Sequence, residues 1–294
     1  MRPLAYNTPH SPALCLCLLL PLAATWGACD APKPLSPAPT PFSQEEKQSL
    51  NDKRIFFAHQ SVGQNILDGL REINSPLPLY PLNPAHPPAA FANPGIVDTL
   101  VGENTQPLSK IEHFEKLVMD GVGNHANIAM LKLCYIDFEA NTDVDALFLR
   151  YEESFQRLRA QFPKLVLAHV TAPLTTVERG AKSWLKKALG KTLGGILENQ
   201  KREAFNQKLR ETYADKEPLF DLALAESTYP DGTRESFEYE GSQIPALVAG
   251  MSDDGGHLNA AGRAHVASAF GHFLAGLPQN THTNSQGDNT KDTP

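Results

Sequence analysis

Apolar runs and amphipathic segments alternate through the middle of the chain. Apolar runs without alternation of apolar and polar positions are typical of strands buried on both faces of a parallel sheet. Five stretches have this character, and we predict a strand in each: residues 54–59, 96–101, 128–136, 165–171 and 219–222. They lie in order along the chain and are separated by segments of a different pattern.

In these separating segments the apolar residues recur three or four positions apart, which is typical of amphipathic helices. The predicted helices are residues 62–70, 107–120, 144–161 and 260–275, with a long helical region before the last strand. Residues 75–97 are dense in Pro, Asn and Ala, so we predict a long loop there. The order of strands and helices predicts an α/β fold, a three-layer α/β/α sandwich around a mostly parallel five-stranded sheet.

The two ends of the chain differ in composition from its middle. Residues 1–29 are predicted to be an export signal, residues 30–45 a Pro-rich linker and residues 278–294 a disordered polar tail. The middle, residues 46–277, is long enough to form one domain with a sizeable core. We therefore expect a single folded domain carried behind an extended linker.

The apolar run from Ala13 to Ala24 is short for a transmembrane helix, which needs about 20 residues. It fits the apolar part of a secretory signal. Residues 25–29 read Thr-Trp-Gly-Ala-Cys, and small residues before a cysteine resemble a bacterial lipobox. We expect Cys29 to become a lipid-modified N-terminus that anchors the protein to a membrane of the cell envelope. Soluble secretion after cleavage, an uncleaved anchor and a start codon placed too early are the alternatives.

Composition narrows the range of partners. The hydrophobic content of 41% is ordinary for a globular protein. A net charge of −7 lacks the basic excess of a general nucleic-acid binder, so we expect no nucleic acid. Cys134 is the only cysteine beyond residue 29, which excludes an internal disulfide framework and gives no support to a thiolate metal site. We expect a monomer with no metal and no cofactor.

The candidate catalytic residues are predicted to lie at the carboxyl ends of the strands, which is where ligands bind in a parallel sheet. Ser61 follows the first predicted strand, and Asp254 and His257 lie just before the last helix. A serine hydroxyl needs an adjacent base such as histidine, and the base needs a third group to orient it. Two glycines separate Asp254 from His257, so a short turn can bring carboxylate and imidazole together. We predict a catalytic triad of Ser61, Asp254 and His257.

The chain resembles the SGNH (GDSL-like) hydrolase family over residues 54–275. The most specific block is residues 254–262, Asp-Gly-Gly-His-Leu-Asn-Ala-Ala-Gly, which is similar to the family's Asp-x-x-His block ahead of its last helix. The resemblance implies an SGNH/flavodoxin-like fold, a nucleophilic serine after the first strand, and an oxyanion hole that includes a glycine and an asparagine. On this basis Gly102 and Asn104 are the candidate oxyanion and substrate-binding residues, beside the Ser61 amide.

Two blocks depart from the family pattern. Residues 59–63 read His-Gln-Ser-Val-Gly instead of Gly-Asp-Ser, and residues 133–137 read Leu-Cys-Tyr-Ile-Asp where Gly-x-Asn-Asp is usual. Gly102 with Asn104 could supply both oxyanion donors from one loop, or Asp137 could occupy the missing position in another role. His59 could contact substrate or hold the turn by a hydrogen bond. We treat His59 and Asp137 as supporting residues of a divergent branch.

The expected function is a serine esterase that forms a covalent acyl-enzyme and acts on an ester, such as an O-acetyl group, of an envelope glycan or lipid. Acyl transfer to another alcohol uses the same chemistry. The main alternative is a non-catalytic envelope lipoprotein that uses the fold for glycan binding or assembly. Residues 182–191 are basic and amphipathic. This segment could form an ordinary surface helix, a lid over the active site or a patch that binds lipid.

Overall fold

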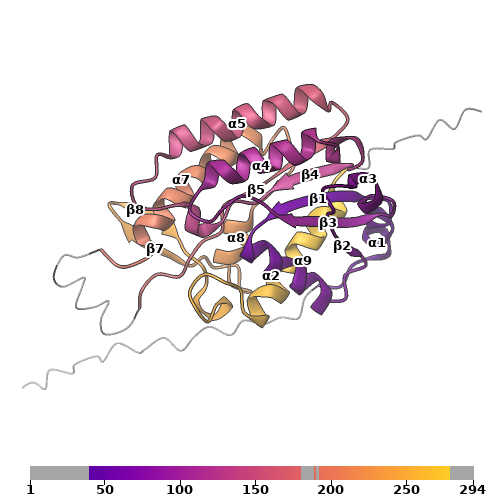
Figure 1. The fold of residues 1–294 in the computed structure, drawn as a ribbon. Helices are drawn as coiled ribbons and strands as arrows, with labels where there is room; N and C mark the ends of the chain where they lie inside the picture. The colour runs from indigo at the N-terminus through magenta and orange to yellow at the C-terminus, as the bar shows by residue number, and fades with distance from the viewer. Residues whose placement is uncertain (1–39, 180–188, 190–191, 279–294) are drawn as a thin grey trace, which may run out of the picture. The chain divides into compact units, whose positions relative to one another are not determined.

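Six parallel strands form the central sheet of the computed structural model, which describes residues 40–179, 189 and 192–278 (Figure 1). Their order is β2-β3-β1-β4-β5-β6, and each neighbouring pair is parallel. The strands are β1 (Arg54–His59), β2 (Leu79–Pro81), β3 (Gly95–Leu100), β4 (Ile128–Leu131), β5 (Val166–Val170) and β6 (Leu219–Phe220). The predicted parallel α/β class is confirmed.

The expected count of five strands is wrong by one, because β2 lies inside the segment that we predicted to be a loop. This strand has three residues and pairs only with β3, at the edge of the sheet. Its residues are half-buried or exposed, and one of them is Pro81. An edge strand of this kind has no apolar run, and proline is tolerated at an edge. The sequence pattern therefore carried no signal for it.

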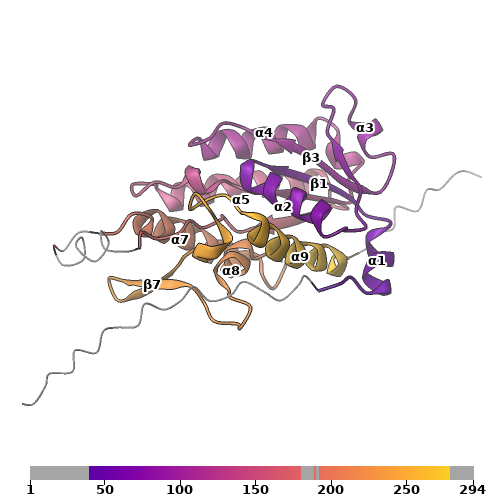
Figure 2. The ribbon, with the colours of Figure 1, turned by 90° about the horizontal axis from the view of Figure 1, so that it is seen from below.

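Helices cover both faces of the sheet (Figures 1 and 2). One face carries α4 (Pro107–Met119), α5 (Val144–Gln161) and α7 (Ile196–Tyr213). The other carries α1 (Gln44–Leu50), α2 (Ser61–Glu72), α8 (Leu222–Ser227) and α9 (Ala260–Gly276). A further short helix, α3 (Pro87–Ala90), follows β2. The three-layer sandwich is thus present, and α2 and α9 pack against each other beneath β1.

The two sides of β1 supply the two hydrophobic cores. Ile55 and Phe57 enter the core under α2 and α9, and Phe56 and Ala58 enter the core under α4 and α5. Successive side chains of a strand point to opposite faces, so a strand covered on both sides needs apolar residues throughout. This is the physical origin of the uninterrupted apolar run that predicted the strand.

Several elements differ from the sequence prediction outside the sheet. The predicted strand at 128–136 ends at Leu131, and the chain turns into a 3₁₀ segment, η2 (Tyr135–Asp137). Two further 3₁₀ segments are η1 (Val122–Asn124) and η3 (Ala249–Met251). An antiparallel hairpin of β7 (Ser236–Tyr239) and β8 (Ser242–Pro245) lies outside the main sheet.

Among the described helices, none has the length and apolarity required to span a membrane.

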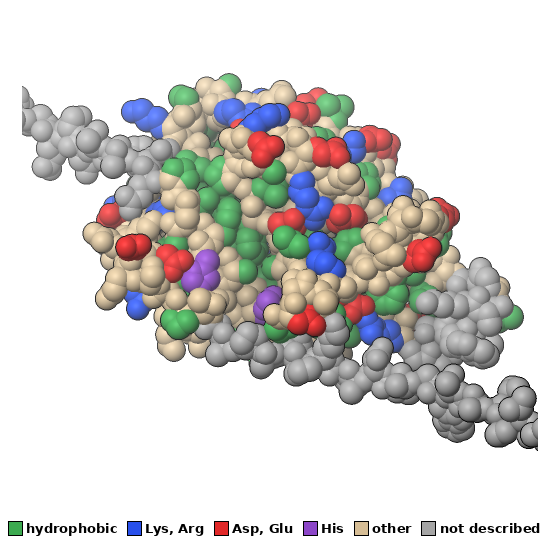
Figure 3. Space-filling model, turned by 180° about the vertical axis from the view of Figure 1, so that it is seen from behind, with side chains coloured by type: hydrophobic (Ala, Val, Ile, Leu, Met, Phe, Trp, Pro, Cys, Tyr) green, Lys and Arg blue, Asp and Glu red, His purple; other side chains and the backbone are tan. Residues whose placement is uncertain are grey.

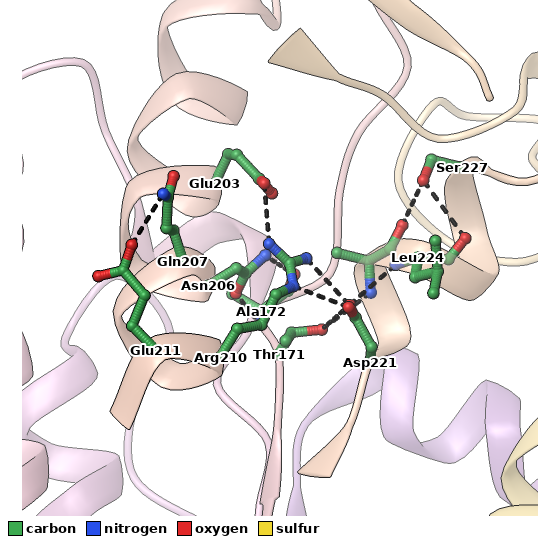
Figure 4. A network of polar contacts seen from close by, with 11 residues as sticks. Thr171, Ala172, Glu203, Asn206, Gln207, Arg210, Glu211, Asp221, Leu224 and Ser227 are labelled. Carbon is green, nitrogen blue, oxygen red and sulfur yellow. Dashed lines mark hydrogen bonds and ion pairs between the residues drawn. The ribbon is translucent and has the colours of Figure 1, made fainter. Parts of the chain in front are cut away.

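A network of polar contacts fixes α7 and α8 against the ends of β5 and β6 (Figure 4). Arg210 of α7 forms two hydrogen bonds to the carboxylate of Asp221, whose Oδ1 also accepts from Thr171 Oγ1 at 3.2 Å. The Asn206 amide both accepts from the Ala172 N–H and donates to the Ala172 carbonyl. Bidentate contacts of this kind define orientation as well as distance, so the segment that leaves β5 is held firmly beside α7.

The strand order defines where a site can form. After β1 the chain adds β3 on one side and then β4 on the other, which is the flavodoxin-like order apart from the edge strand β2. Such a reversal opens a crevice at the carboxyl ends of the two strands that flank it. Here these ends lead into α2, which begins at Ser61, and into η2, which begins at Tyr135.

Candidate active site

Ser61, His257 and Asp254 form a continuous chain of hydrogen bonds. The Ser61 Oγ lies 2.9 Å from His257 Nε2, and His257 Nδ1 lies 2.6 Å from Asp254 Oδ2. The structure therefore brings together the three residues of the predicted triad, although 196 positions separate Ser61 from His257 in the chain. Histidine can remove the serine proton in this arrangement, because the hydroxyl is hydrogen-bonded to an imidazole that is itself hydrogen-bonded to a carboxylate.

The turn that carries Asp254 and His257 is built by the Asp254 carboxylate itself. Its Oδ1 accepts hydrogen bonds from the N–H groups of Gly256 and His257, and its Oδ2 remains for the imidazole. Gly255 has a φ of +90°, a conformation that favours glycine. The hydrogen bond that His257 donates to Asp254, followed by the backbone N–H bonds, holds the pKa of Asp254 well below its usual range. The carboxylate therefore stays ionised and acts as an acceptor.

Ser61 is the first residue of α2, and its hydroxyl is not used to cap the helix. The N-cap residue is Gln60, which makes no side-chain cap bond. Instead, Gln60 Nε2 donates to the carbonyls of Val101 and Gly102 and ties this turn to the end of β3. Within the part of the chain that the structure describes, no acceptor takes the N–H of Ser61 or Val62. Two donors at a helix N-terminus are thus free to bind a developing negative charge.

Asn65 joins α2 to the turn from the other side. Its Oδ1 accepts a hydrogen bond from the Leu258 N–H at 3.1 Å, next to His257 in the chain. Asn65 lies one turn of helix after Ser61, so a single rigid element carries both the serine and the anchor of the histidine segment. Asn259, which caps α9 through the Gly262 N–H, fixes the other end of this segment.

Tyr135 lies directly against His257. Its hydroxyl is 3.4 Å from His257 Nε2 and 3.5 Å from Nδ1, and the two rings meet edge to face with their centroids 5.5 Å apart. The in-plane positions of both ring nitrogens are already occupied by Ser61 and Asp254. Burial raises the pKa of the Tyr135 phenol. The hydroxyl therefore remains protonated and is available to donate to a substrate atom beside Ser61.

Gly102 and Asn104, the predicted oxyanion residues, have other partners in this structure. The Gly102 N–H donates to His113 Nδ1 at 3.1 Å, and Asn104 Oδ1 accepts from Lys110 Nζ. Gly102 has a φ of +57°, and a Cβ added there would lie 2.5 Å from the Lys110 backbone nitrogen. Close packing against α4 thus accounts for this glycine, and its N–H would have to leave His113 before it could bind an oxyanion.

Asp137, predicted to be a supporting residue, is a buried anchor. Both of its carboxylate oxygens accept from Lys110 Nζ, at 2.6 and 2.7 Å, and neither side chain is exposed. The same carboxylate accepts from the N–H groups of Cys134 and Thr105. It therefore fixes the segment that carries Tyr135 to the loop after β3.

His59 is fully buried at the end of β1. Its Nδ1 is 2.9 Å from the Gln60 carbonyl, and its Nε2 is 3.2 Å from Asp98 Oδ2 on β3. A Cβ added at Gly63 would lie 2.4 Å from His59 Cβ and Cγ, so the start of α2 packs closely on this ring. His59 was expected either to contact substrate or to hold the turn by a hydrogen bond. Its contacts in the structure match the second role.

Several predictions fall wholly or partly outside the described part of the chain, including the export signal at residues 1–29, the linker at 30–45 and the polar tail at 278–294. Cys29, the predicted lipidation site, precedes residue 40, and residues 182–188 with 190–191 belong to the basic segment. Cys134 is a buried free thiol. Across residues 40–179 and 192–278, no group of three His, Cys, Asp or Glu side chains is placed to hold a metal ion.

Three residues of the site were not singled out from the sequence: Tyr135, Asn65 and Arg202. Tyr135 lies near the carboxyl end of the predicted strand 128–136, and that position could have drawn attention to it. Arg202 lies within α7, donates from Nε to the Tyr135 carbonyl, and is 3% exposed. An arginine in an amphipathic helix is normally exposed, so nothing in the sequence pattern indicated that Arg202 is buried.

Comparison with known proteins gives matches among solved structures only. No family model and no curated protein matches the chain. A lipase/acylhydrolase from Enterococcus faecalis is 14% identical, with 78% of this chain and 98% of that chain covered and a TM-score of 0.43. A protein assigned to the G-D-S-L lipolytic family, from Desulfitobacterium hafniense DCB-2, is 8% identical, with 75% and 99% covered and a TM-score of 0.43.

The periplasmic domain of a lipopolysaccharide acetyltransferase from Salmonella ser. Paratyphi A is 10% identical, with 76% of this chain and 84% of that chain covered and a TM-score of 0.42. The matched structures include members of the family that the sequence motifs resemble. At these identities and TM-scores they carry no argument about activity, which has to rest on the chemistry of the site.

Proposed function

We propose that the chain is a serine acyl hydrolase in which Ser61 is the nucleophile. The observation that carries the proposal is the 2.9 Å contact between Ser61 Oγ and His257 Nε2, in an imidazole whose Nδ1 bonds to Asp254. A serine placed for capping alone would bond to backbone N–H groups of its own helix. This serine bonds to a histidine from the far end of the chain instead.

The reaction proceeds in two acyl transfers. Ser61 Oγ attacks the ester carbonyl carbon while its proton passes to His257 Nε2. The tetrahedral intermediate collapses, and His257 returns that proton to the departing alcohol, which leaves an acyl-Ser61 ester. Water then attacks this ester, His257 takes a proton from the water, and Ser61 recovers the proton as the free acid leaves. Asp254 orients His257 and stabilises its charged form.

The negative charge on the carbonyl oxygen is stabilised by three donors. They are the N–H groups of Ser61 and Val62 at the start of α2 and the hydroxyl of Tyr135. Side-chain hydroxyls as well as backbone amides serve in oxyanion holes. In this assignment Tyr135 takes the role for which Gly102 and Asn104 were the sequence candidates, because the Gly102 N–H is engaged by His113.

The substrate that we propose is an ester, such as an O-acetyl group, of an envelope glycan or lipid. Its support is the predicted export signal with Cys29 as a lipid anchor. Transfer of the acyl group to an alcohol instead of water would use the same residues.

Hydrolysis of p-nitrophenyl acetate and butyrate by the purified full-length chain tests the proposal. Ser61→Ala and His257→Ala are each expected to abolish turnover, while Ser236→Ala on β7 and His86→Ala before α3 leave it unchanged. Turnover that survives Ser61→Ala would mean that another group is the nucleophile. A folded chain without turnover would favour the alternative of a non-catalytic binding protein.

A further inference from the structure

A small cavity opens beside Tyr135. Its volume is about 290 Å³. We call it the Arg202 pocket; its lining includes Tyr135, Phe138, Glu139, Thr175, Glu198 and Arg202. Small-molecule sites in proteins are typically about 300–1,000 Å³. The pocket lies just below that range, so it suits one ring-sized group.

The pocket adjoins the site at Tyr135, which lines the pocket and contacts His257, whereas Ser61 and His257 are not part of the lining. Tyr135 contacts His257 with its hydroxyl, and its backbone carbonyl accepts from Arg202 Nε at 3.0 Å. The Arg202 guanidinium also lies 5.9 Å from the centroid of the Tyr135 ring. A substrate whose reacting bond lies at Ser61 could therefore place a neighbouring group in the pocket.

Arg202 is the polar centre of the pocket. Its Nη1 donates to Thr175 Oγ1 and Asn199 Oδ1, and Nε donates to Tyr135, whereas Nη2 has no partner among the described residues. Burial lowers the pKa of Arg202 to about 10, so it is still charged at neutral pH. A buried guanidinium with an unused nitrogen gains most from a ligand that accepts a hydrogen bond.

Two carboxylates line the pocket together with this donor. Glu139 is exposed and Glu198 is half-buried in the first turn of α7, and the side chain of neither has a hydrogen-bond or ion-pair partner within the described part of the chain. The basic and acidic side chains of one face of the molecule are likewise interleaved in Figure 3. The pocket thus offers one cationic donor and two anionic acceptors.

This combination selects among ligand classes. An aliphatic acyl chain would remove Arg202 Nη2 and Glu198 from water without replacing their hydrogen bonds, which costs free energy. An anion would meet two carboxylates and a single guanidinium. Hydroxyl groups both donate and accept, so a polyol satisfies both kinds of group, and its C–H surface can pack on Tyr135 and on the exposed side chain of Ile136, which also lines the pocket.

We propose that the Arg202 pocket binds a neutral sugar ring that forms the alcohol part of the ester. The link to an ester rests on the proposed function, whereas the binding of the sugar does not. A small acyl group then remains at Ser61 beside the oxyanion donors, and the sugar determines which esters are hydrolysed.

Calorimetric titration of Ser61→Ala protein with methyl glycosides of glucose, galactose and N-acetylglucosamine tests the binding directly. At least one is expected to bind, and Glu198→Leu should weaken that binding about tenfold, the effect of losing one hydrogen bond to a charged group. Glu198→Gln, which keeps hydrogen-bonding atoms, should weaken it less. Glu211→Leu, at the other end of α7, is the matched control and should bind like the parent.

A kinetic comparison connects the pocket to the reaction. Glu198→Leu is expected to lower kcat/KM about tenfold for a mono-O-acetylated methyl glycoside, whereas the control Glu211→Leu should leave it unchanged. Absence of glycoside binding, or tighter binding of hexanoate than of any glycoside, would overturn the proposal even if p-nitrophenyl acetate is hydrolysed. Glycoside binding without hydrolysis of any ester would instead overturn the proposed function and leave the pocket assignment standing.

Discussion

The Tyr135 hydroxyl lies 3.4 Å from His257 Nε2, although the two residues are 122 positions apart and belong to different segments. Tyr135 begins the 3₁₀ segment after β4, and His257 ends the turn before α9. A hydroxyl in this position lies beside the imidazole nitrogen that contacts Ser61. It is therefore the side-chain donor that we assign to the oxyanion hole.

Tyr135→Phe removes only this hydroxyl and keeps the ring against His257. We expect kcat for p-nitrophenyl acetate to fall by about 10²-fold, the usual effect of losing one oxyanion donor, with little change in KM. Steady-state kinetics measure both constants. Tyr80→Phe on β2 is the matched control, and an equal loss in both variants would assign the effect to general destabilisation.

Asp254→Asn removes the charge that orients His257 and keeps the size of the side chain. We expect kcat to fall by on the order of 10³- to 10⁴-fold, because an amide can present the wrong group to His257 Nδ1. The pKa of Asp254 is held below its usual range by its hydrogen bond to His257. The ordinary pKa of an aspartate lies near the lower end of the interval between about pH 5 and 4, and protonation of Asp254 should therefore cause no loss of kcat/KM in that interval. A fall in kcat/KM within this pH interval, if absent in Asp254→Asn, would contradict this prediction.

The buried pair of Lys110 and Asp137 predicts an effect on stability. Lys110→Met leaves the Asp137 carboxylate buried without its cation, and we expect a loss of about 3–5 kcal/mol in the free energy of unfolding. Urea denaturation measures this. The double variant Lys110→Met with Asp137→Asn should lose less than Lys110→Met alone, because no uncompensated charge remains. A loss in the double variant equal to the sum of the two single losses would contradict the assignment.

Glu226 predicts how stability changes with pH. Burial raises the pKa of Glu226 to about 8, and its Oε1 has no partner within the described part of the chain, whereas Oε2 accepts from the Leu174 N–H. Between the unfolded pKa near 4.5 and the folded value, the unfolded chain loses a proton that the folded chain keeps. The contribution of Glu226 to stability is therefore complete below about pH 4.5 and declines as pH rises to about 8.

Glu226→Gln removes this titration and keeps the shape of the side chain. Relative to Glu226→Gln, the parent should lose up to about 1.4 kcal/mol of unfolding free energy for each pH unit between 5 and 8. Urea denaturation at several pH values gives the difference. Parallel curves for the two proteins would show that Glu226 is ionised in the folded state.

The sequence was informative where a structural feature is local. Asp254 and His257 are close in the chain, and a turn with Gly255 at positive φ joins them, so their spacing alone predicted their contact. The apolar run of β1 and the helical pattern after Ser61 likewise depend on neighbours in the chain. These patterns predicted the parallel sandwich and the three residues that the structure brings together.

The sequence was uninformative where a feature depends on distant packing. Tyr135 reaches His257 only because β4 lies beside β1 and turns into η2 at its end. Gly102 has the residue type of an oxyanion donor, but its positive φ and its close approach to Lys110 explain the glycine equally well. Residue type alone does not separate these roles, because the direction of an N–H group is a property of the folded backbone.

The central claim is that Ser61 is an activated nucleophile, and reaction with a fluorophosphonate tests it most directly. We expect a single phosphonyl adduct on the peptide that contains Ser61, identified by mass spectrometry, and loss of that adduct in both Ser61→Ala and His257→Ala. An adduct on another residue, or equal labelling of parent and His257→Ala, would contradict the claim that His257 activates Ser61.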